Sequence, residues 1–299
     1  MTAGPTLPLE TSLVATALAE RLQAKRDAAG PRPTSDGTRG RGSTAQSCAR
    51  KIALDLHRPT EWTPTYTQHI AFMVGQDVHD RIQETMRVDF NARAEVPVSY
   101  KPKFDLSGNV DLVYDFHPIT GETRTNLVTG EIKSMRQYAW DKAVGVSYGR
   151  PKITDDVGPK LEHVTQAALY GCAPQLESSY LHMIYFGKDT GQIAEWLIGM
   201  DEEMPHLDGR TPRQLAEKEL VRQQKIFDGL DAGRLPARSI PGFGRVEEIS
   251  DDPKKNHWAC NFCNHQAVCR RLGVESCSTE DVEAALAADG NENQETDLW

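Results

Sequence analysis

The sequence lacks a long apolar run. No stretch of about 18 consecutive apolar residues occurs in its 299 residues, so the sequence predicts no transmembrane helix. The first residues, MTAGPTLPLE, lack a basic segment followed by an apolar one, so we expect no signal peptide. We therefore expect a cytoplasmic protein with no membrane partner, in a compartment where clustered cysteines bind metal more often than they form disulfides.

Cysteine is also scarce. The chain has six cysteines, and three of them, Cys260, Cys263 and Cys269, fall within the ten residues CNFCNHQAVC. Soft sulfur ligands at this spacing suit Zn²⁺ or an iron–sulfur cluster, and either centre needs a fourth ligand. The residues alone leave that ligand open among Cys48, Cys172 and Cys277, with His257 and His265 as further candidates for zinc.

Positive charge is absent from the C-terminal end. From Ser278 onward there are seven acids and no Lys or Arg, and we expect residues 273–299 to form an acidic, disordered tail. The net charge of the whole chain is −9, and it is −2 without those seven acids. The stretch Lys25–Arg58 holds eight basic residues against three acids. The overall charge therefore does not exclude a nucleic-acid partner.

The hydrophobic pattern predicts an α/β fold. Apolar residues recur with helical spacing at residues 9–29, 45–57, 65–90, 159–172 and 211–229. Short apolar or alternating runs predict strands at residues 95–100, 104–116, 126–135, 179–186 and 193–199. This order indicates a mixed sheet covered by helices. We divide the chain into a helix and basic Gly/Pro/Ser loop (1–42), a main domain (43–272) and the acidic tail (273–299).

Two predicted strands carry charged residues that strand pairing can bring together. Asp111 lies in GNVDLVYD, and Glu131 and Lys133 lie in GEIKSM, where residues two apart share a face. Pairing of these strands would place two carboxylates and an ammonium at one spot, which suits Mg²⁺ or Mn²⁺. By itself the pattern Glu-x-Lys is weak, because exposed charge pairs of this form are common in strands.

Two predicted helices carry pairs of residues four apart, so that both members lie on one face. Gly75 and His79 lie on the long helix, where the glycine leaves room for a ligand beside the imidazole. Gln166 and Tyr170 lie on a later helix and are suited to hold a phosphate or a strand backbone. Taken alone, each pair is more commonly a feature of an ordinary helix, as a packed or surface histidine in the first case and as part of an amphipathic helix in the second.

In their order along the chain, these features resemble the RecB-like branch of the PD-(D/E)XK nuclease superfamily. They are most similar to the Cas-four-type iron–sulfur exonucleases, which occur beside CRISPR systems and in bacteriophages. The resemblance covers about residues 43–272 and rests on six motifs: Cys48, Gly75–His79, Gly108–Asp111, Glu131–Lys133, Gln166–Tyr170 and Cys260–Cys263–Cys269. Val110 stands where the name of the superfamily has proline.

The resemblance implies a restriction-endonuclease-like core, in which helix, three strands, helix and strand follow one another. It also implies roles for the residues at its centre. His79, Asp111, Glu131 and the backbone carbonyl of Ile132 would bind Mn²⁺ or Mg²⁺. Lys133 would orient the water that attacks the scissile phosphate. Gln166 and Tyr170 would position the DNA strand or steady Lys133.

The resemblance also assigns the fourth thiol. Cys48 would join Cys260, Cys263 and Cys269 around a [4Fe–4S] cluster, which would clasp the N- and C-terminal segments together. Basic residues around Cys48 would then lie near a phosphate backbone, namely Arg39, Arg41, Arg50 and Lys51.

The function that follows is a metal-dependent DNA exonuclease acting at single-stranded or duplex ends in recombination, repair or end processing. One alternative is a nucleic-acid-binding factor of a DNA-processing or CRISPR-adaptation complex, in which catalysis is dispensable. Another is a zinc-stabilised binding module. The sequence leaves open the polarity of digestion, the strand preference, a recombination or CRISPR-adaptation protein as partner, assembly as a homo-oligomer, and the roles of Cys172 and Cys277.

Overall fold

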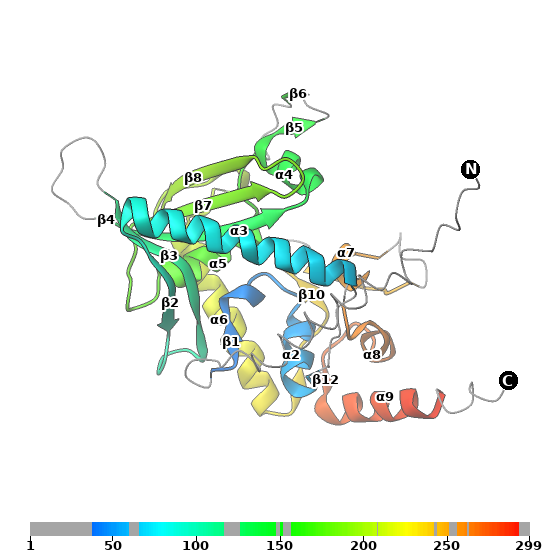
Figure 1. Cartoon of the computed structure of the whole chain (residues 1–299). Coiled ribbons are helices and arrows are strands. Elements are labelled where there is room, and N and C mark those ends of the chain that lie inside the picture. Colours follow the sequence, from blue (N-terminus) through cyan, green and yellow to red (C-terminus); the bar gives the residue numbers. More distant parts are fainter. Residues whose placement is uncertain are drawn as a thin grey trace, which may run out of the picture.

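The computed structural model describes residues 38–59, 66–116, 126–147, 150–151, 157–207, 209–241, 244–250, 256–261 and 263–292. The helix expected at residues 9–29 and most of the basic loop after it lie outside these described residues. Within them the fold is α/β, with helices on both faces of one mixed sheet, as expected (Figure 1). None of the described helices is long and apolar enough to span a bilayer.

The main sheet has six strands: β1 (Gly40–Arg41), β2 (Arg93–Ser99), β3 (Leu106–Phe116), β4 (Asn126–Met135), β7 (Tyr180–Gly187) and β8 (Ile193–Gly199). Their order is β1-β3-β4-β7-β8, and β2 pairs with β3. The β1–β3 and β4–β7 pairs are parallel and the other pairs are antiparallel. The β4–β7 connection contains a helix, as parallel neighbours require.

The sheet contains a fork between β3 and β4. One side of β3 pairs with β2 from Ser107 to Val113. On the other side, β4 pairs with β3 only as far as Leu112, opposite Gly130, and β1 pairs only with Leu106 and Ser107. Residues 108–111 of β3 therefore have no strand partner on that side in the described part of the chain. We call this unpaired stretch, with the facing part of β4, the fork.

Long helices cover the two faces of the sheet. Helix α3 (Tyr66–Phe90) crosses one face, where Leu112, Ile132 and Ile184 are buried, and α5 (Leu161–Gly171) packs on the other (Figure 1). Helix α6 (Pro212–Asp231) packs against α5 and begins with a capping box between Thr211 and Gln214. Between β4 and α5 lie α4 (Gln137–Val144), β5 (Val146–Ser147) and β6 (Arg150–Pro151).

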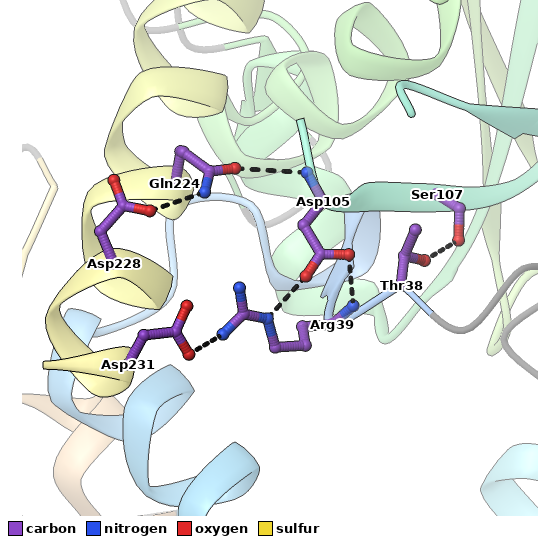
Figure 2. A network of polar contacts seen from close by, with 7 residues as sticks. All are labelled: Thr38, Arg39, Asp105, Ser107, Gln224, Asp228 and Asp231. Carbon is purple, nitrogen blue, oxygen red and sulfur yellow. Dashed lines mark hydrogen bonds and ion pairs between the residues drawn. The ribbon is translucent and has the colours of Figure 1, made fainter. Parts of the chain in front are cut away.

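A polar network holds the first described residues against the sheet and α6 (Figure 2). The Arg39 guanidinium pairs with Asp105 at 2.6 Å and with Asp231 of α6 at 2.6 Å. The Gly40 amide donates to the Asp105 carbonyl, and the hydroxyls of Thr38 and Ser107 form a hydrogen bond. These contacts fix β1 beside the start of β3, and so they close one end of the fork.

The segments before and after the sheet pack together. Helix α2 (Ala49–His57) contacts α6 and shares a buried cluster with α8 (Gln266–Arg271) and α9 (Thr279–Glu292). The shorter elements of this region are η2 (Gly42–Thr44), η3 (Pro205–Leu207), β9 (Arg234–Leu235), β10 (Ser239–Ile240), β11 (Gly244–Arg245), α7 (Trp258–Asn261) and β12 (Cys277–Ser278).

The acidic tail differs from the expectation of disorder. Cys277 and Ser278 pair with β9, and the acidic residues that follow form α9. Val282 of α9 is fully buried in the cluster with Ile52 and Phe227, and this contact orders the helix despite its charge. Residues 293–299 lie outside the described residues.

Candidate functional site

The fork places Asp111 opposite Glu131. The β3–β4 register pairs Leu112 with Gly130, so the next opposed positions are Asp111 and Glu131, where the ladder has ended. The Asp111 carboxylate accepts a hydrogen bond from the Ile132 amide at 2.8 Å. A side chain thus replaces the missing ladder bond, because a buried amide without a partner would be costly. No ladder pair joins β3 and β4 beyond this point in the described residues, so both carboxylates lie where the two strands separate.

Glu131 is buried at the fork, and its two oxygens differ. Its Oε1 lies 2.5 Å from the Lys133 ammonium, whereas its Oε2 is buried without a hydrogen-bond partner among the described residues. Burial raises the pKa of Glu131 to about 7, although Lys133 opposes the shift. Burial lowers the pKa of Lys133 most strongly, but the hydrogen bond and attraction to Glu131, together with the charges of Asp111 and Glu162, raise it overall. The pair therefore consists of a charged lysine and a carboxyl that ionises near neutral pH.

His79 reaches the fork from α3. Its Nδ1 lies 3.9 Å from Asp111 Oδ2. Gly75, one turn earlier, lets α3 approach β4, because a Cβ at this position would lie 3.1 Å from the hydroxyl of Ser134. Burial lowers the pKa of His79, and the charge of Lys133 lowers it further. A neutral imidazole beside a carboxylate is a suitable metal ligand.

Gln166 and Tyr170 approach the fork from α5. Gln166 Oε1 accepts a hydrogen bond from Lys133 Nζ at 3.1 Å, and Gln166 also hydrogen-bonds with Tyr170. The Tyr170 ring lies against Gly42 and Gly108, where an added Cβ would lie 2.5 Å from the ring in both cases. The glycine of the Gly108–Asp111 motif is therefore required by the tyrosine of another motif. Burial raises the pKa of Tyr170, so the phenol stays neutral.

A cleft of about 470 Å³ opens from the fork. Its walls include His79, Asp111, Gln166 and Tyr170. Arg41, which the resemblance placed near a phosphate backbone, also lines this cleft. Sequence reasoning missed Glu95, Ser134 and Lys188 as residues of its wall. Lys188 follows directly after β7 and carries no motif, so only the parallel β4–β7 register could have revealed it.

The donor set of the fork fits a hard divalent cation. It offers the carboxylates of Asp111 and Glu131 and the neutral imidazole of His79. The buried Glu131 Oε2 has no hydrogen-bond partner among the described residues. The side chain of Ile132 is buried toward α3, and its amide is held by Asp111. As placed, no group of three or more His, Cys, Asp or Glu side chains in the described residues is arranged to hold a metal ion.

A second cavity, of about 750 Å³, lies beside the fork and is lined by four thiols. These are Cys48, at the N-terminus of α2, with Cys260, Cys263 and Cys269. Burial raises the pKa of Cys260, Cys263 and Cys269, and the nearby Cys48 adds to the shift at each of them. Lys133 and Gln166 line the same cavity, so the thiols adjoin the carboxylate site.

The four thiols of this cavity are of the ligand type that a metal–thiolate centre uses, although as placed the described thiols are not arranged to hold a metal ion. Cys172 and Cys277 do not line the cavity. Two of the histidines that line the cavity are the zinc-ligand candidates of the sequence, and of these His265 hydrogen-bonds to Asp55 at 2.8 Å. The other, His257, accepts a hydrogen bond from the Ala259 amide at 3.2 Å. Four thiols in one cavity are the ligands that zinc and iron–sulfur clusters prefer.

Comparison with known proteins gives no family. No family model matches the sequence, and no curated protein matches it. The structure is similar to the crystal structure of SSO0001, with 14% sequence identity and a TM-score of 0.48 over 86% of this chain and 96% of that chain. Similarity at this level says nothing about function.

Proposed function

We propose that this protein is a metal-dependent DNA exonuclease of the RecB-like branch of the PD-(D/E)XK superfamily. The observation that carries the proposal is the convergence at the fork. His79, Asp111, Glu131, Lys133 and Gln166 come from four different elements and meet at the fork. One buried oxygen of Glu131 there has no partner in the described structure. Buried polar atoms are normally hydrogen-bonded, and functional sites are a common exception.

In this proposal His79, Asp111, Glu131 and the Ile132 carbonyl would hold Mn²⁺ or Mg²⁺. The cation would polarise the scissile phosphate and stabilise the charge that develops there. Lys133 orients the attacking water. The Lys133 ammonium is itself held by Glu131 on one side and by Gln166 on the other. Tyr170 in turn fixes Gln166.

The cleft supports DNA as the substrate. Arg41 and Lys188 bring positive charge to its wall, and Lys188 Nζ is held by the Ala71 carbonyl at 2.9 Å. Cationic side chains bind the phosphate backbone regardless of base sequence. A nuclease without sequence preference and with access to DNA ends would serve recombination, repair or end processing, with a recombination or CRISPR-adaptation protein as partner.

The four cysteines would hold a [4Fe–4S] cluster with a structural role. Cys48 directly precedes α2 and Cys269 lies in α8, and these helices share the buried cluster that includes Ile52 and Val268. A cluster at this place would add a covalent link between segments more than 200 residues apart, and so would stabilise the fold.

The test is digestion of end-labelled linear DNA and closed circular DNA with Mn²⁺. The wild type is compared with Lys133→Met and with Lys142→Met, a control that removes an exposed lysine of α4. We expect loss of linear DNA only, abolished by Lys133→Met and unchanged by Lys142→Met.

Absence of digestion by a folded wild type that contains iron would favour the nucleic-acid-binding factor instead. A colourless, zinc-containing and inactive protein would favour the zinc-stabilised module.

A further inference from the structure

Two buried arginines lie in or next to the cavity lined by thiols. Arg50 of α2 is fully buried, and Arg238 is 4% exposed and lines the cavity. Sequence reasoning placed Arg50 near a phosphate backbone, whereas the structure buries it inside the protein. Neither arginine forms an ion pair with a carboxylate in the described part of the chain. A buried charge without a counter-charge is costly, so these two residues need an explanation.

Arg50 is held by backbone carbonyls. Its Nε donates to the Pro236 carbonyl at 3.0 Å and its Nη1 to the Gly273 carbonyl at 2.5 Å, and Nη2 donates to the Glu275 carbonyl. These neutral acceptors fix the guanidinium without cancelling its charge. Arg50 also hydrogen-bonds to Cys269.

Arg238 is only partly satisfied. Its Nη2 donates to the Glu247 carbonyl at 3.0 Å, whereas Nε and Nη1 are buried without a partner among the described residues. Its charge acts on Cys260 and Cys269, two of the thiols in the cavity. An unsatisfied guanidinium in a cavity lined by thiols indicates that an anionic group belongs in that cavity.

We propose that Arg50 and Arg238 are the counter-charges of an anionic [4Fe–4S] centre held by Cys48, Cys260, Cys263 and Cys269. This inference rests on the proposed cluster and assigns to it residues outside the six motifs. Four thiolates contribute four negative charges, and the oxidised core contributes two positive ones. The two guanidinium groups balance the two negative charges that remain. Reduction adds one electron, so the reduced centre depends more strongly on these arginines than the oxidised centre does.

Loss of one arginine charge should therefore make the cluster harder to reduce. The charge of Arg238 is buried, where opposite charges attract more strongly than in water. We expect Arg238→Gln to lower the ratio of reduced to oxidised cluster about tenfold at a fixed potential, which corresponds to a shift of about 59 mV for one electron. Arg238→Lys keeps the charge and should keep the potential close to that of the wild type.

The experiment measures iron and sulfide content, and then the midpoint potential by dithionite titration, in full-length protein purified without oxygen. The variants are Arg238→Gln, Arg238→Lys and the control Arg58→Gln, which removes an exposed arginine at the end of α2. A more negative potential in Arg238→Gln alone supports the proposal. Loss of the cluster from a folded Arg238→Gln, with the cluster kept in Arg238→Lys, also supports it.

An unchanged midpoint potential in Arg238→Gln overturns the proposed role of the arginines but does not contradict the proposed cluster. Loss of the cluster from both Arg238 variants also overturns it, because the role of the side chain would then be steric. A wild type that carries zinc or no metal overturns the proposed cluster and, with it, the inference.

Discussion

Two glutamates of this protein are equally buried, at 1% exposure, and have opposite surroundings. Both oxygens of Glu219 on α6 are satisfied, by Arg222 through two hydrogen bonds and by Gln223 at 3.0 Å. Glu131 at the fork keeps one oxygen without a partner among the described residues. The difference teaches that burial alone does not mark a site. A fully paired carboxylate serves the fold, and an incompletely paired one is available to a ligand.

The largest expected effect separates the two glutamates by activity. Glu131→Gln should reduce the rate of DNA digestion by about 10³-fold, because it removes a charge from the centre where the transition state is stabilised. Glu219→Gln keeps the shape of a residue that only supports packing, and should change the rate by less than about twofold. Rates with Mn²⁺ on linear DNA check both values. Equal losses of digestion rate in the two variants would contradict a catalytic role that Glu131 has and Glu219 lacks.

The next effect distinguishes Glu131 from Glu219 by the free energy of unfolding. Glu219→Ala should lower the free energy of unfolding by about 3 kcal/mol, because Arg222 would lose its ion pair in a largely buried place. Glu131→Gln should cost less than about 1 kcal/mol at pH 7.5, because its ion pair with Lys133 is offset by the burial of the charge. Urea denaturation of both variants measures this, and a larger loss in Glu131→Gln would contradict the account.

A smaller effect concerns the glycine beneath Tyr170. Gly108→Ala would place a Cβ 2.5 Å from the Tyr170 ring, so the ring must move. We expect a loss of about 2 kcal/mol in stability from overpacking. The shift should also lower the digestion rate about tenfold, because Tyr170 positions Gln166. A second substitution, Tyr170→Phe in the wild type, keeps the ring and tests the hydroxyl alone. A Gly108→Ala variant with wild-type rate and stability would show that the contact is unimportant.

The smallest effect is the pH dependence of the Glu131 contribution. Burial raises the pKa of Glu131 in the fold from 4.5 to about 7, so its contribution to stability is present below pH 4.5 and is lost as the pH rises through about 7. The glutamine side chain introduced by Glu131→Gln cannot ionise. Relative to the wild type this variant should therefore gain roughly 1–2 kcal/mol between pH 6 and pH 7.5. Denaturation in metal-free buffer at both pH values measures the difference, and a constant difference would mean that Glu131 has an ordinary pKa.

Much of the fold could be predicted from the sequence, because local patterns determine it. The strands that contain Asp111 and Glu131 have short apolar or alternating runs, and antiparallel pairing brings these two positions opposite each other. The long helix α3 and the pair Gln166 and Tyr170 have clear helical spacing. These are short-range signals, and they suffice to assemble the centre of the site.

The remaining features depend on distant contacts. The two residues of β1 pair with β3 only because Arg39 is held by Asp105 and Asp231, far away in the sequence. The burial of Arg50 depends on carbonyls more than 180 residues later. The order of α9 depends on a pocket for Val282. No local sequence pattern predicts contacts between residues so far apart. The sequence therefore predicted a phosphate contact for Arg50 and disorder for the residues of α9.

Binding of Mn²⁺ tests the central claim most directly, since it requires neither DNA nor turnover. Free Mn²⁺ can be followed by its EPR signal during titration of the wild type, Glu131→Gln and Glu219→Gln. The account predicts binding to the wild type and to Glu219→Gln, and loss of binding in a folded Glu131→Gln. Undiminished binding in Glu131→Gln would contradict the assignment of the fork as the metal site.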